Sequence, residues 1–308
     1  MSKIAVVGSL LVDLSMRTPR VPQKGENLQV TEYKMGAGGK GANAAAAITR
    51  LGGEALIVGC VGDDHLGRLE ISALEAEGVD TAGVTRVPGR PTDLAVLMVH
   101  ESGENTVLAV TSTNHLLTDQ AVESALRSQW GSLDAILVNF ECSEGAVAAA
   151  VRSGKDHGIP IVVDAGPIRG FGAETWRDAT VLSPNVDEAA ALVGVAVTGL
   201  RDDEHVHRIA QELLAAGPAA VLVKRGEKGA LLVTRRETVR IPAFPVEVVD
   251  STGAGDAFTA ALTLALAEGS PLQKAARFAS AAGAVAATQF GTLEAMPTLA
   301  AVNELLSG

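Results

Sequence analysis

Short apolar runs alternate along the chain with longer segments in which apolar residues recur every three or four positions. The run at residues 3–9 is nearly continuous in apolar side chains, as in a strand covered on both faces. The segment 65–77 has Leu66, Leu69 and Leu74 at near-helical spacing, which is typical of a helix with one apolar face. Because the two patterns keep alternating, the sequence predicts an α/β fold, a doubly wound and mostly parallel sheet with helices on both faces.

The same patterns predict an element over most of the remaining chain. Further helices are expected at residues 42–50, 118–128, 143–157, 186–192, 202–216, 257–268, 272–288 and 300–306. Further strands are expected at residues 55–60, 135–140, 161–163, 180–182, 220–223, 230–233 and 244–249. Since the chain has no internal repeat and no low-complexity tail, a single domain over residues 1–308 is the simplest organisation.

Two regions depart from this pattern. Polar and apolar residues largely alternate at 28–33, which is typical of a strand with one face in water. The runs 94–99 and 106–110 flank residues 101–105, Glu-Ser-Gly-Glu-Asn, whose composition is that of a hairpin turn. We therefore predict a small separate sheet, a lid, formed by about 11–35 and 93–111.

Composition narrows the class of protein. The chain has 308 residues, of which 47% are hydrophobic and 3% aromatic, so the core has to be built from aliphatic and alanine side chains. Its net charge is 25 minus 36, or −11, without a long basic run, which argues against nucleic-acid binding. No stretch reaches the roughly 18 apolar residues that span a bilayer, so we expect no membrane insertion.

The cysteines and the N-terminal residues indicate the cellular compartment in which we expect the protein. Cys60 and Cys142 both lie in apolar, strand-like runs and have no partner at zinc or redox spacing, so we interpret them as buried thiols. The apolar start of the chain is interrupted by Gly8 and followed by Asp13, which fits a first strand better than a signal peptide. We expect a cytoplasmic protein without disulfides.

Candidate chemistry is concentrated in two glycine-rich stretches. The first is the decapeptide 249–258, Val-Asp-Ser-Thr-Gly-Ala-Gly-Asp-Ala-Phe, which comes between a predicted strand and a predicted helix. Gly253 and Gly255 at the start of that helix leave backbone N–H groups and the positive end of the dipole free to hold an anion. Asp256 is then either a helix N-cap or the group that takes a proton from whatever attacks a bound phosphate.

The second stretch runs from Gly36 to Asn43, Gly-Ala-Gly-Gly-Lys-Gly-Ala-Asn. Its glycine spacing matches the dinucleotide fingerprint, with Asp63 as the acid after the next strand, so an NAD-dependent dehydrogenase is one alternative. The alternating strand before it and Lys40 within it argue against that alternative. No Gly-Lys-Ser/Thr follows, so it is not a Walker A loop.

Together these stretches resemble the two signatures of the ribokinase family, the pfkB-type carbohydrate kinases. Gly-Gly-Lys-Gly-Ala-Asn at 38–43 matches the first signature and 249–258 the second, with an Asn-x-x-Glu motif at 185–188 between them. The resemblance covers essentially the whole chain. It implies an ATP-dependent kinase that phosphorylates a sugar hydroxyl with Mg²⁺ and a monovalent cation, K⁺, and that pairs through its lid as a homodimer.

The resemblance also implies a role for individual residues. In the sugar site it places Asp13, Gly39, Lys40, Asn43 and Glu141. At the catalytic centre it places Asp256 as the base, with the backbone of Gly253, Ala254 and Gly255 around the transferred phosphate. At the nucleotide it places Asn185, Lys224, Gly226, Gly229, Gly255 and Ser280. For cations it implies Glu188 on Mg²⁺ through water, and Asp250, Thr252, Ala286, Gln289 and Gly291 around K⁺.

Each of these residues has an ordinary structural explanation when taken alone. Asp13 would be a solvated lid residue, Glu141 an acid before a helix, and Lys224 part of a surface pair. Asn185 and Glu188 would cap the helix that they precede. Taken together, they follow the ends of successive strands, where doubly wound sheets bind their ligands.

Three departures from the ribose-kinase pattern concern the sugar. Residues 164–167 read Asp-Ala-Gly-Pro where ribose kinases commonly have Asn-Pro-Ala-Pro, and 112–114 read Ser-Thr-Asn where Gly-Ala-Asn is expected. Leu11 stands where some members carry a sugar-binding asparagine. We expect phosphorylation of a primary hydroxyl of a small monosaccharide, with D-ribose the leading candidate. Fructose and a nucleoside remain alternatives, and a sugar-sensing protein without catalysis is an alternative of another class.

Overall fold

The computed structural model describes residues 1–100, 105–195 and 202–308. A nine-stranded sheet runs through the molecule in the order β13-β12-β11-β10-β9-β8-β1-β4-β5. Its strands are β1 (Lys3–Val7), β4 (Glu54–Gly62), β5 (Asp80–Val87), β8 (Ala135–Asn139), β9 (Ile161–Asp164), β10 (Val181–Leu182), β11 (Ala220–Lys224), β12 (Ala230–Thr234) and β13 (Thr238–Ile241). All neighbouring pairs are parallel except β11 with β12 and β12 with β13. The predicted doubly wound, mostly parallel sheet is confirmed.

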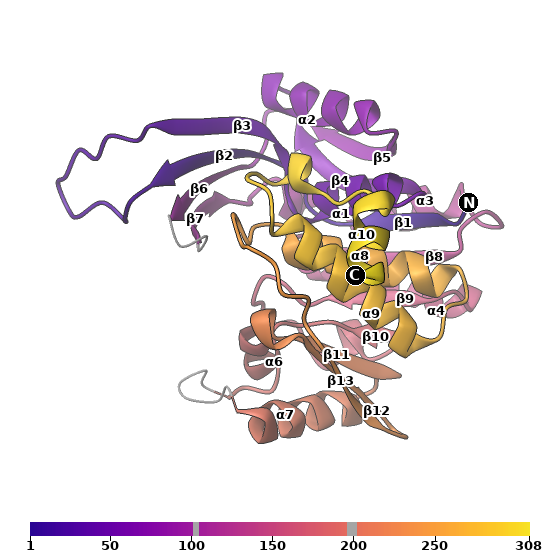
Figure 1. Cartoon of the computed structure of the whole chain (residues 1–308). Helices are drawn as coiled ribbons and strands as arrows, with labels where there is room; N and C mark the ends of the chain where they lie inside the picture. Colours follow the sequence, from indigo (N-terminus) through magenta and orange to yellow (C-terminus); the bar gives the residue numbers. More distant parts are fainter. Residues whose placement is uncertain (101–104, 196–201) are drawn as a thin grey trace.

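Helices cover both faces of this sheet (Figure 1). One face carries α1 (Lys40–Arg50), α2 (His65–Ala76), α8 (Ala254–Ala267), α9 (Leu272–Ala286) and α10 (Leu299–Ser307). The other carries α3 (Asp119–Arg127), α4 (Glu144–His157), α5 (Ala173–Trp176), α6 (Val186–Leu192) and α7 (Asp203–Ala215). Successive residues of β1 enter different cores: Val6 packs into the first and Ala5 and Val7 into the second. That is why the buried strands are apolar at every position.

A second sheet, of four strands, projects away from the main body of the molecule (Figure 1). It has the order β3-β2-β6-β7, from β2 (Leu11–Thr18), β3 (Glu32–Gly38), β6 (Leu94–His100) and β7 (Asn105–Val110). Along β2, Asp13 and Ser15 are buried whereas Leu14 and Met16 are half-buried. The expected small sheet is confirmed, and the polar Asp13 and Ser15 belong to its covered face.

Two local predictions are wrong. The run 244–249 is not a strand but an extended segment without a ladder partner. Pro242 and Pro245 have no N–H to donate, and only at Val249 does the backbone bond to a neighbour, Ala287 O at 2.9 Å. The alternating segment 28–33 joins the small sheet only from Glu32 onward. The sequence analysis also did not identify β5 and β13, which lie at the two edges of the large sheet.

Among the helices of the described ranges, none combines the length and the apolar character that crossing a bilayer would require.

Candidate active site

Polar side chains collect at one edge of the large sheet because its parallel strands end there. Asp164 and Lys224 are the last residues of β9 and β11, and Ser9, Glu141 and Asn185 follow β1, β8 and β10 closely. This edge is where open α/β sheets bind ligands. The predicted Glu141, Asn185 and Lys224 are therefore brought together, and Ser9 and Asp164, which the sequence analysis did not assign to the site, join them.

The N-terminus of α8 forms an anion site at this edge. Gly253 is the N-cap residue, with φ 76°, and no side chain caps the helix. The positive φ favours glycine at this position, and a Cβ there would lie 2.7 Å from the end of the flexible Met296 side chain. Asp256 lies in the first turn of the helix, so its interpretation as the N-cap is wrong. Ala254 N–H donates to Ser251 O at 3.3 Å, which leaves Gly255 and Asp256 to supply the N–H groups at the helix mouth.

Asp256 joins the two glycine-rich stretches. Its carboxylate is 4% exposed, with Oδ1 3.2 Å from Lys40 Nζ and Oδ2 accepting from Asn43 Nδ2 at 2.9 Å. Lys40 and Asn43 lie in the first turn of α1 and Asp256 in the first turn of α8. Asn43 Oδ1 is buried without a hydrogen-bond partner among the described residues. A ligand hydroxyl that donates to this oxygen would satisfy it.

Lys40 is the positive centre of the cluster. Its Nζ also lies 3.9 Å from Asp164 Oδ2. Burial by itself would lower the pKa of this ammonium, but the surrounding carboxylates, with Asp256 and Asp164 foremost, hold its pKa well above the usual value. Lys40 is therefore positively charged at neutral pH.

Asp13 approaches the cluster from the small sheet. Burial, followed by repulsion from Glu141, Asp256 and Glu294, raises the pKa of Asp13 to about 7, against a hydrogen bond from Thr292 that lowers it. A Cβ on Gly38 would lie 2.0 Å from Asp13 Oδ2, so glycine at that position makes room for the carboxylate. Asp13 is thus a buried site residue and not the solvated lid residue of the alternative interpretation.

Thr292 and Glu294 are site residues that the sequence analysis missed. They lie after α9, with Thr292 at the N-cap of the 3-10 turn Leu293–Ala295 and Glu294 within it, and they match no motif. Glu294 Oε1 would lie 2.8 Å from a Cβ on Gly36, which places it against the small sheet. No local pattern signals an approach between residues so distant along the chain.

Glu141 is held from two sides. Ser9 Oγ donates to its Oε2, and the backbone N–H of Lys40 donates to the same oxygen at 3.3 Å. Gly39, at the N-cap of α1, has φ 91° and its Cβ would lie 2.9 Å from Ser9 O. Glu141, Ser9 and the start of α1 therefore form one continuous polar wall.

Asn185 and Glu188 form a capping box at the start of α6. Asn185 Oδ1 accepts from Glu188 N–H at 2.8 Å, and Glu188 Oε2 accepts from Asn185 N–H at 2.7 Å. Burial raises the pKa of Glu188, and Asp164 adds to this while Lys224 opposes it. A Cβ on Gly166 would lie 2.5 Å from Glu188 Oε1 and 3.1 Å from Lys40 Cε, so the second carboxylate oxygen lies against Gly166 close to Lys40.

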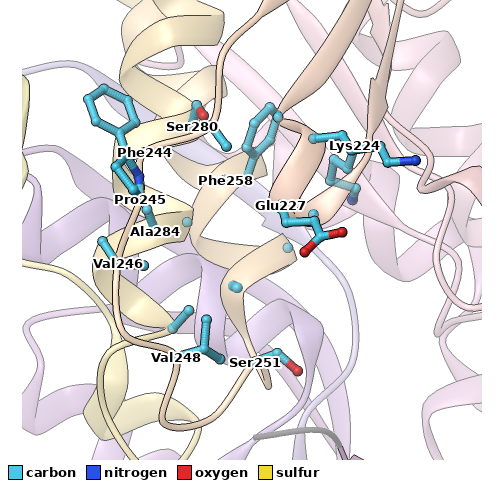
Figure 2. Close-up of a pocket in the computed structure, with 18 residues that line it drawn as sticks. Lys224, Glu227, Phe244, Pro245, Val246, Val248, Ser251, Phe258, Ser280 and Ala284 are labelled. Carbon is cyan, nitrogen blue, oxygen red and sulfur yellow. The ribbon is translucent and has the colours of Figure 1, made fainter. Parts of the chain in front are cut away.

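A pocket of about 660 Å³ opens beside the N-terminus of α8 (Figure 2). The segment that carries Phe244, Val246 and Val248 forms one wall, with Phe258 and Lys224 opposite. It is lined by five residues expected at the nucleotide, namely Lys224, Gly226, Gly229, Gly255 and Ser280. Its size and apolar walls suit a nucleobase and ribose. The extended segment 244–249, which was wrongly predicted to be a strand, thus forms a wall of this pocket.

Asp250 organises the loop before α8. Its side chain is completely buried, Oδ1 accepts from Thr252 N–H and Oγ1 at 2.9 and 2.6 Å, and Oδ2 accepts from Gly291 N–H at 3.2 Å. No lysine or arginine of the described ranges pairs with it. The expected cation residues Ala286 and Gln289 adjoin this loop, because Ala287 O accepts from Asp250 N–H. A buried carboxylate with polar loops around it is a setting that fits a monovalent cation.

The dehydrogenase alternative does not fit the fold. The strand before Gly36–Gly41 is β3, which pairs antiparallel with β2 in the small sheet. A dinucleotide fingerprint follows the buried first strand of a parallel unit. The glycines instead let α1 approach the chain after β1, since a Cβ on Gly41 would lie 2.7 Å from the backbone of Gly8.

Comparison with known proteins gives concordant matches over the whole chain. Residues 1–299 match the family described as pfkB family carbohydrate kinase. The chain is 36% identical to the ribokinase of Bacillus subtilis over 307 residues, covering 100% of both chains. It is 32% identical to the deoxyribokinase of Salmonella typhimurium over 305 residues, covering 99% of this chain and 98% of the other. The structure of Arabidopsis thaliana ribokinase complexed with ribose and ATP matches at a TM-score of 0.86, with 30% identity and 100% of both chains covered.

Proposed function

The chain belongs to the pfkB family of carbohydrate kinases, which makes it an ATP-dependent sugar kinase, and we propose that it phosphorylates a primary hydroxyl of a small monosaccharide, D-ribose first. The observation that carries this proposal is the place of Asp256. Its carboxylate lies at the uncapped N-terminus of α8, with the polar cluster of Lys40 and Asn43 on one side and the 660 Å³ pocket on the other.

The reaction follows from that arrangement. The sugar hydroxyl oxygen attacks the γ-phosphorus of ATP, its proton passes to the Asp256 carboxylate, and the bond to the leaving oxygen of ADP breaks. A base positioned in this way contributes about 10²–10⁴-fold to the rate. The N–H groups of Gly255 and Asp256 and the ammonium of Lys40 stabilise charge on the transferred phosphoryl oxygens. The hydrogen bond from Asn43 holds Asp256 in position.

Magnesium fits the acidic side of the cleft. Glu188 uses Oε2 in the capping box, whereas its Oε1 lies against Gly166 close to Lys40. Asn185 and Glu188 would hold Mg²⁺ on the ATP phosphates through water, where the ion neutralises phosphate charge.

A monovalent cation, K⁺, is proposed beside Asp250. The buried carboxylate and the carbonyl groups of the loops that meet there supply oxygen ligands. Ala295 has no hydroxyl where members of the family often have one, so we expect weak affinity. Replacing K⁺ by tetramethylammonium at constant ionic strength should lower kcat, and an unchanged kcat would remove this site from the proposal.

The sugar cradle is rich in hydrogen-bonding groups. Asp13 and Glu141 offer carboxylates, Lys40 an ammonium and Asn43 an unpaired buried oxygen. Each hydroxyl of a polyhydroxylated ring can donate to an acid and accept from Lys40. Such a site rejects ligands that leave its buried polar groups unpaired. This supports a monosaccharide over a nucleoside.

One observation favours a second candidate, 2-deoxy-D-ribose. Leu11 is 3% exposed, and its Cγ lies 3.2 Å from where a Cβ on Gly39 would be. An apolar side chain therefore lies against the sugar cradle, where it can pack on a ring carbon that has no hydroxyl. A deoxyribokinase is among the relatives, in line with this alternative.

A substrate panel tests the proposal. ADP formation is measured with D-ribose, 2-deoxy-D-ribose, D-fructose and adenosine, and the phosphorylated carbon is identified by NMR. We expect the two pentoses to have the highest kcat/KM, with phosphate on the primary hydroxyl. Leu11→Asn should shift the ratio of kcat/KM values toward ribose. Preference for adenosine contradicts the proposal, and sugar binding without turnover would establish the sugar-sensing alternative.

The small sheet supports a homodimer. Its uncovered face carries a cross-strand row, Met35–Leu14–Val96–Leu108, in which Met35 and Leu108 are 52% and 63% exposed. Tyr33, two residues from Met35 on the same strand face, is 70% exposed. A second copy of the sheet laid against this face would remove these side chains from water.

A further inference from the structure

Asp164 lies between two lysines at the edge of the large sheet. The carboxylate is 2% exposed, with Oδ1 accepting from Lys224 Nζ at 2.7 Å and Oδ2 lying 3.9 Å from Lys40 Nζ. Lys40 in turn contacts Asp256. The four side chains form an alternating row, Lys224–Asp164–Lys40–Asp256, that crosses the cleft from β11 to α8.

Lys224 occupies the end of this row that faces the nucleotide pocket. Its Nζ lies 3.7 Å from where a Cβ on Gly255 would be, so the ammonium adjoins the N-terminus of α8. Lys224 also lines the pocket (Figure 2). A phosphate bound at the helix N-terminus would therefore have Lys224 on one side and Lys40 on the other.

The charges at this edge of the large sheet favour phosphate binding by Lys224. Four carboxylates act on Lys40, those of Asp256, Asp164, Glu141 and Glu188, whereas the cluster holds two lysines. A polyphosphate that enters so acidic a cleft needs cations close to its oxygens. A lysine that served only to neutralise Asp164 would not need to adjoin the anion site.

We propose that Lys224 is a catalytic residue that contacts the β- and γ-phosphate oxygens of ATP, and that Asp164 is the positioning residue that holds its ammonium beside the helix N-terminus. This inference rests on the proposed sugar kinase activity. Lysine has a long flexible stem, so the charge-assisted hydrogen bond to Asp164 reduces the conformational entropy lost when phosphate binds. The pair also accounts for Asp164 where ribose kinases commonly have asparagine.

Nucleotide affinity tests the contact without catalysis. Dissociation constants of AMP, ADP and a non-hydrolysable ATP analogue are measured by calorimetry for the wild type and Lys224→Met. We expect AMP to be unaffected and the ATP analogue to bind about tenfold more weakly, since a charged hydrogen bond to phosphate is lost. Equal weakening of all three nucleotides, or of none, would overturn the proposal. This outcome is independent of which sugar, if any, is phosphorylated.

Turnover and stability together separate a catalytic from a structural role. Lys224→Met should lower kcat about a hundredfold with the dissociation constant of the sugar unchanged, and should lower Tm because Asp164 loses its nearest partner. In the double variant Lys224→Met/Asp164→Asn the unpaired charge is gone, so Tm should recover while kcat stays low. Recovery of kcat along with Tm would show that Lys224 serves only the fold.

A matched control uses an exposed lysine–aspartate pair. Lys155 Nζ lies 2.9 Å from Asp178 Oδ1, and the two side chains are 57% and 33% exposed. Lys155→Met and Lys155→Met/Asp178→Asn should change neither kcat nor the nucleotide series. A similar loss in these controls would contradict a specific role for Lys224.

Discussion

At the scale of single residues, the site places the same chemical group in different surroundings. Asp256 Oδ1 lies 3.2 Å from Lys40 Nζ, and its Oδ2 accepts from Asn43 Nδ2 at 2.9 Å. Among the described residues no cationic side chain contacts Asp13, and burial raises the pKa of Asp13 to about 7. The role of Asp256 as the base therefore rests on its position at the anion site of α8, and that of Asp13 on its place in the sugar cradle, where a carboxyl group can accept or donate a hydrogen bond.

Replacement of the base tests the first assignment. Asp256→Asn keeps the shape and the hydrogen bond with Asn43 but cannot accept the proton, so kcat should fall by about a hundredfold or more. Dissociation constants of sugar and ATP, from calorimetry, should change little. A variant that turns over near the wild-type rate would show that Asp256 is not the base.

The raised pKa of Asp13 predicts a dependence of stability on pH. In the folded protein the pKa of Asp13 is about 7, whereas in the unfolded chain it returns to its ordinary value of 3.8. The stability contributed by the bound proton is thus present below pH 4 and is lost as pH rises to 7. Asp13→Asn has no such loss, so its Tm should rise relative to that of the wild type as pH increases from 4 to 7.

Thermal unfolding at several pH values provides the measurement, with the exposed Asp156→Asn as the control. The control should show no change in its Tm difference over the same range. A Tm difference for Asp13→Asn that stays constant with pH would contradict the assigned pKa. The variant should also lose sugar turnover far more than ATP binding, since the carboxylate is placed in the sugar cradle.

At the scale of elements, the position of α1 determines the geometry of the cleft. Its first turn carries Lys40 and Asn43, and it lies directly on the chain after β1, with Ala42 N–H donating to Ser9 O at 3.2 Å. Gly41 makes this approach possible, because its Cβ would lie 2.7 Å from both Gly8 C and Ser9 O. The contacts are with backbone, which cannot move aside as a side chain can.

Two glycines at the second position of a helix allow a matched comparison. Gly41→Ala should destabilise the protein by about 1–3 kcal/mol through overpacking and lower kcat by displacing Lys40. Gly145→Ala at the second position of α4, where only Ser143 Oγ lies within 4.0 Å, should stabilise by up to about 1 kcal/mol. Urea unfolding measures both. Equal effects would contradict the close approach of α1.

At the scale of the whole molecule, the small sheet has two different faces. The face with Asp13 and Ser15 is buried toward the cleft, while the other exposes the apolar row that ends in Met35 and Leu108. A sheet with an apolar exposed face is not stable in isolation. The proposed homodimer covers it, and would tie the sugar site to the association of two copies.

Sedimentation velocity tests this association. Leu108→Glu places a charge in the apolar row, so the proposed dimer should dissociate into monomers, and the sugar KM should rise because the sheet that carries Asp13 loses its support. Leu306→Glu, on the last turn of α10, should leave the oligomeric state unchanged. A monomeric wild type would contradict the dimer.

The sequence by itself determined most elements of the large sheet and many residues of the site. Hydrophobic periodicity is a local property, so runs such as 135–140 and 161–163 identify β8 and β9. Parallel strands end at one edge, which explains why Glu141 and Lys224, predicted from motifs after separate strands, meet there.

Only the tertiary structure decided the rest, because it depends on contacts that no local pattern encodes. The run 244–249 has the composition of a strand, yet Pro245 within it, Pro242 just before it and its place along the pocket leave it without a ladder. Thr292 and Glu294 reach Asp13 across most of the chain length. Asp164 was recognisable in the sequence only as a departure from a motif, and the packing of β9 between its neighbours is what sets it between two lysines.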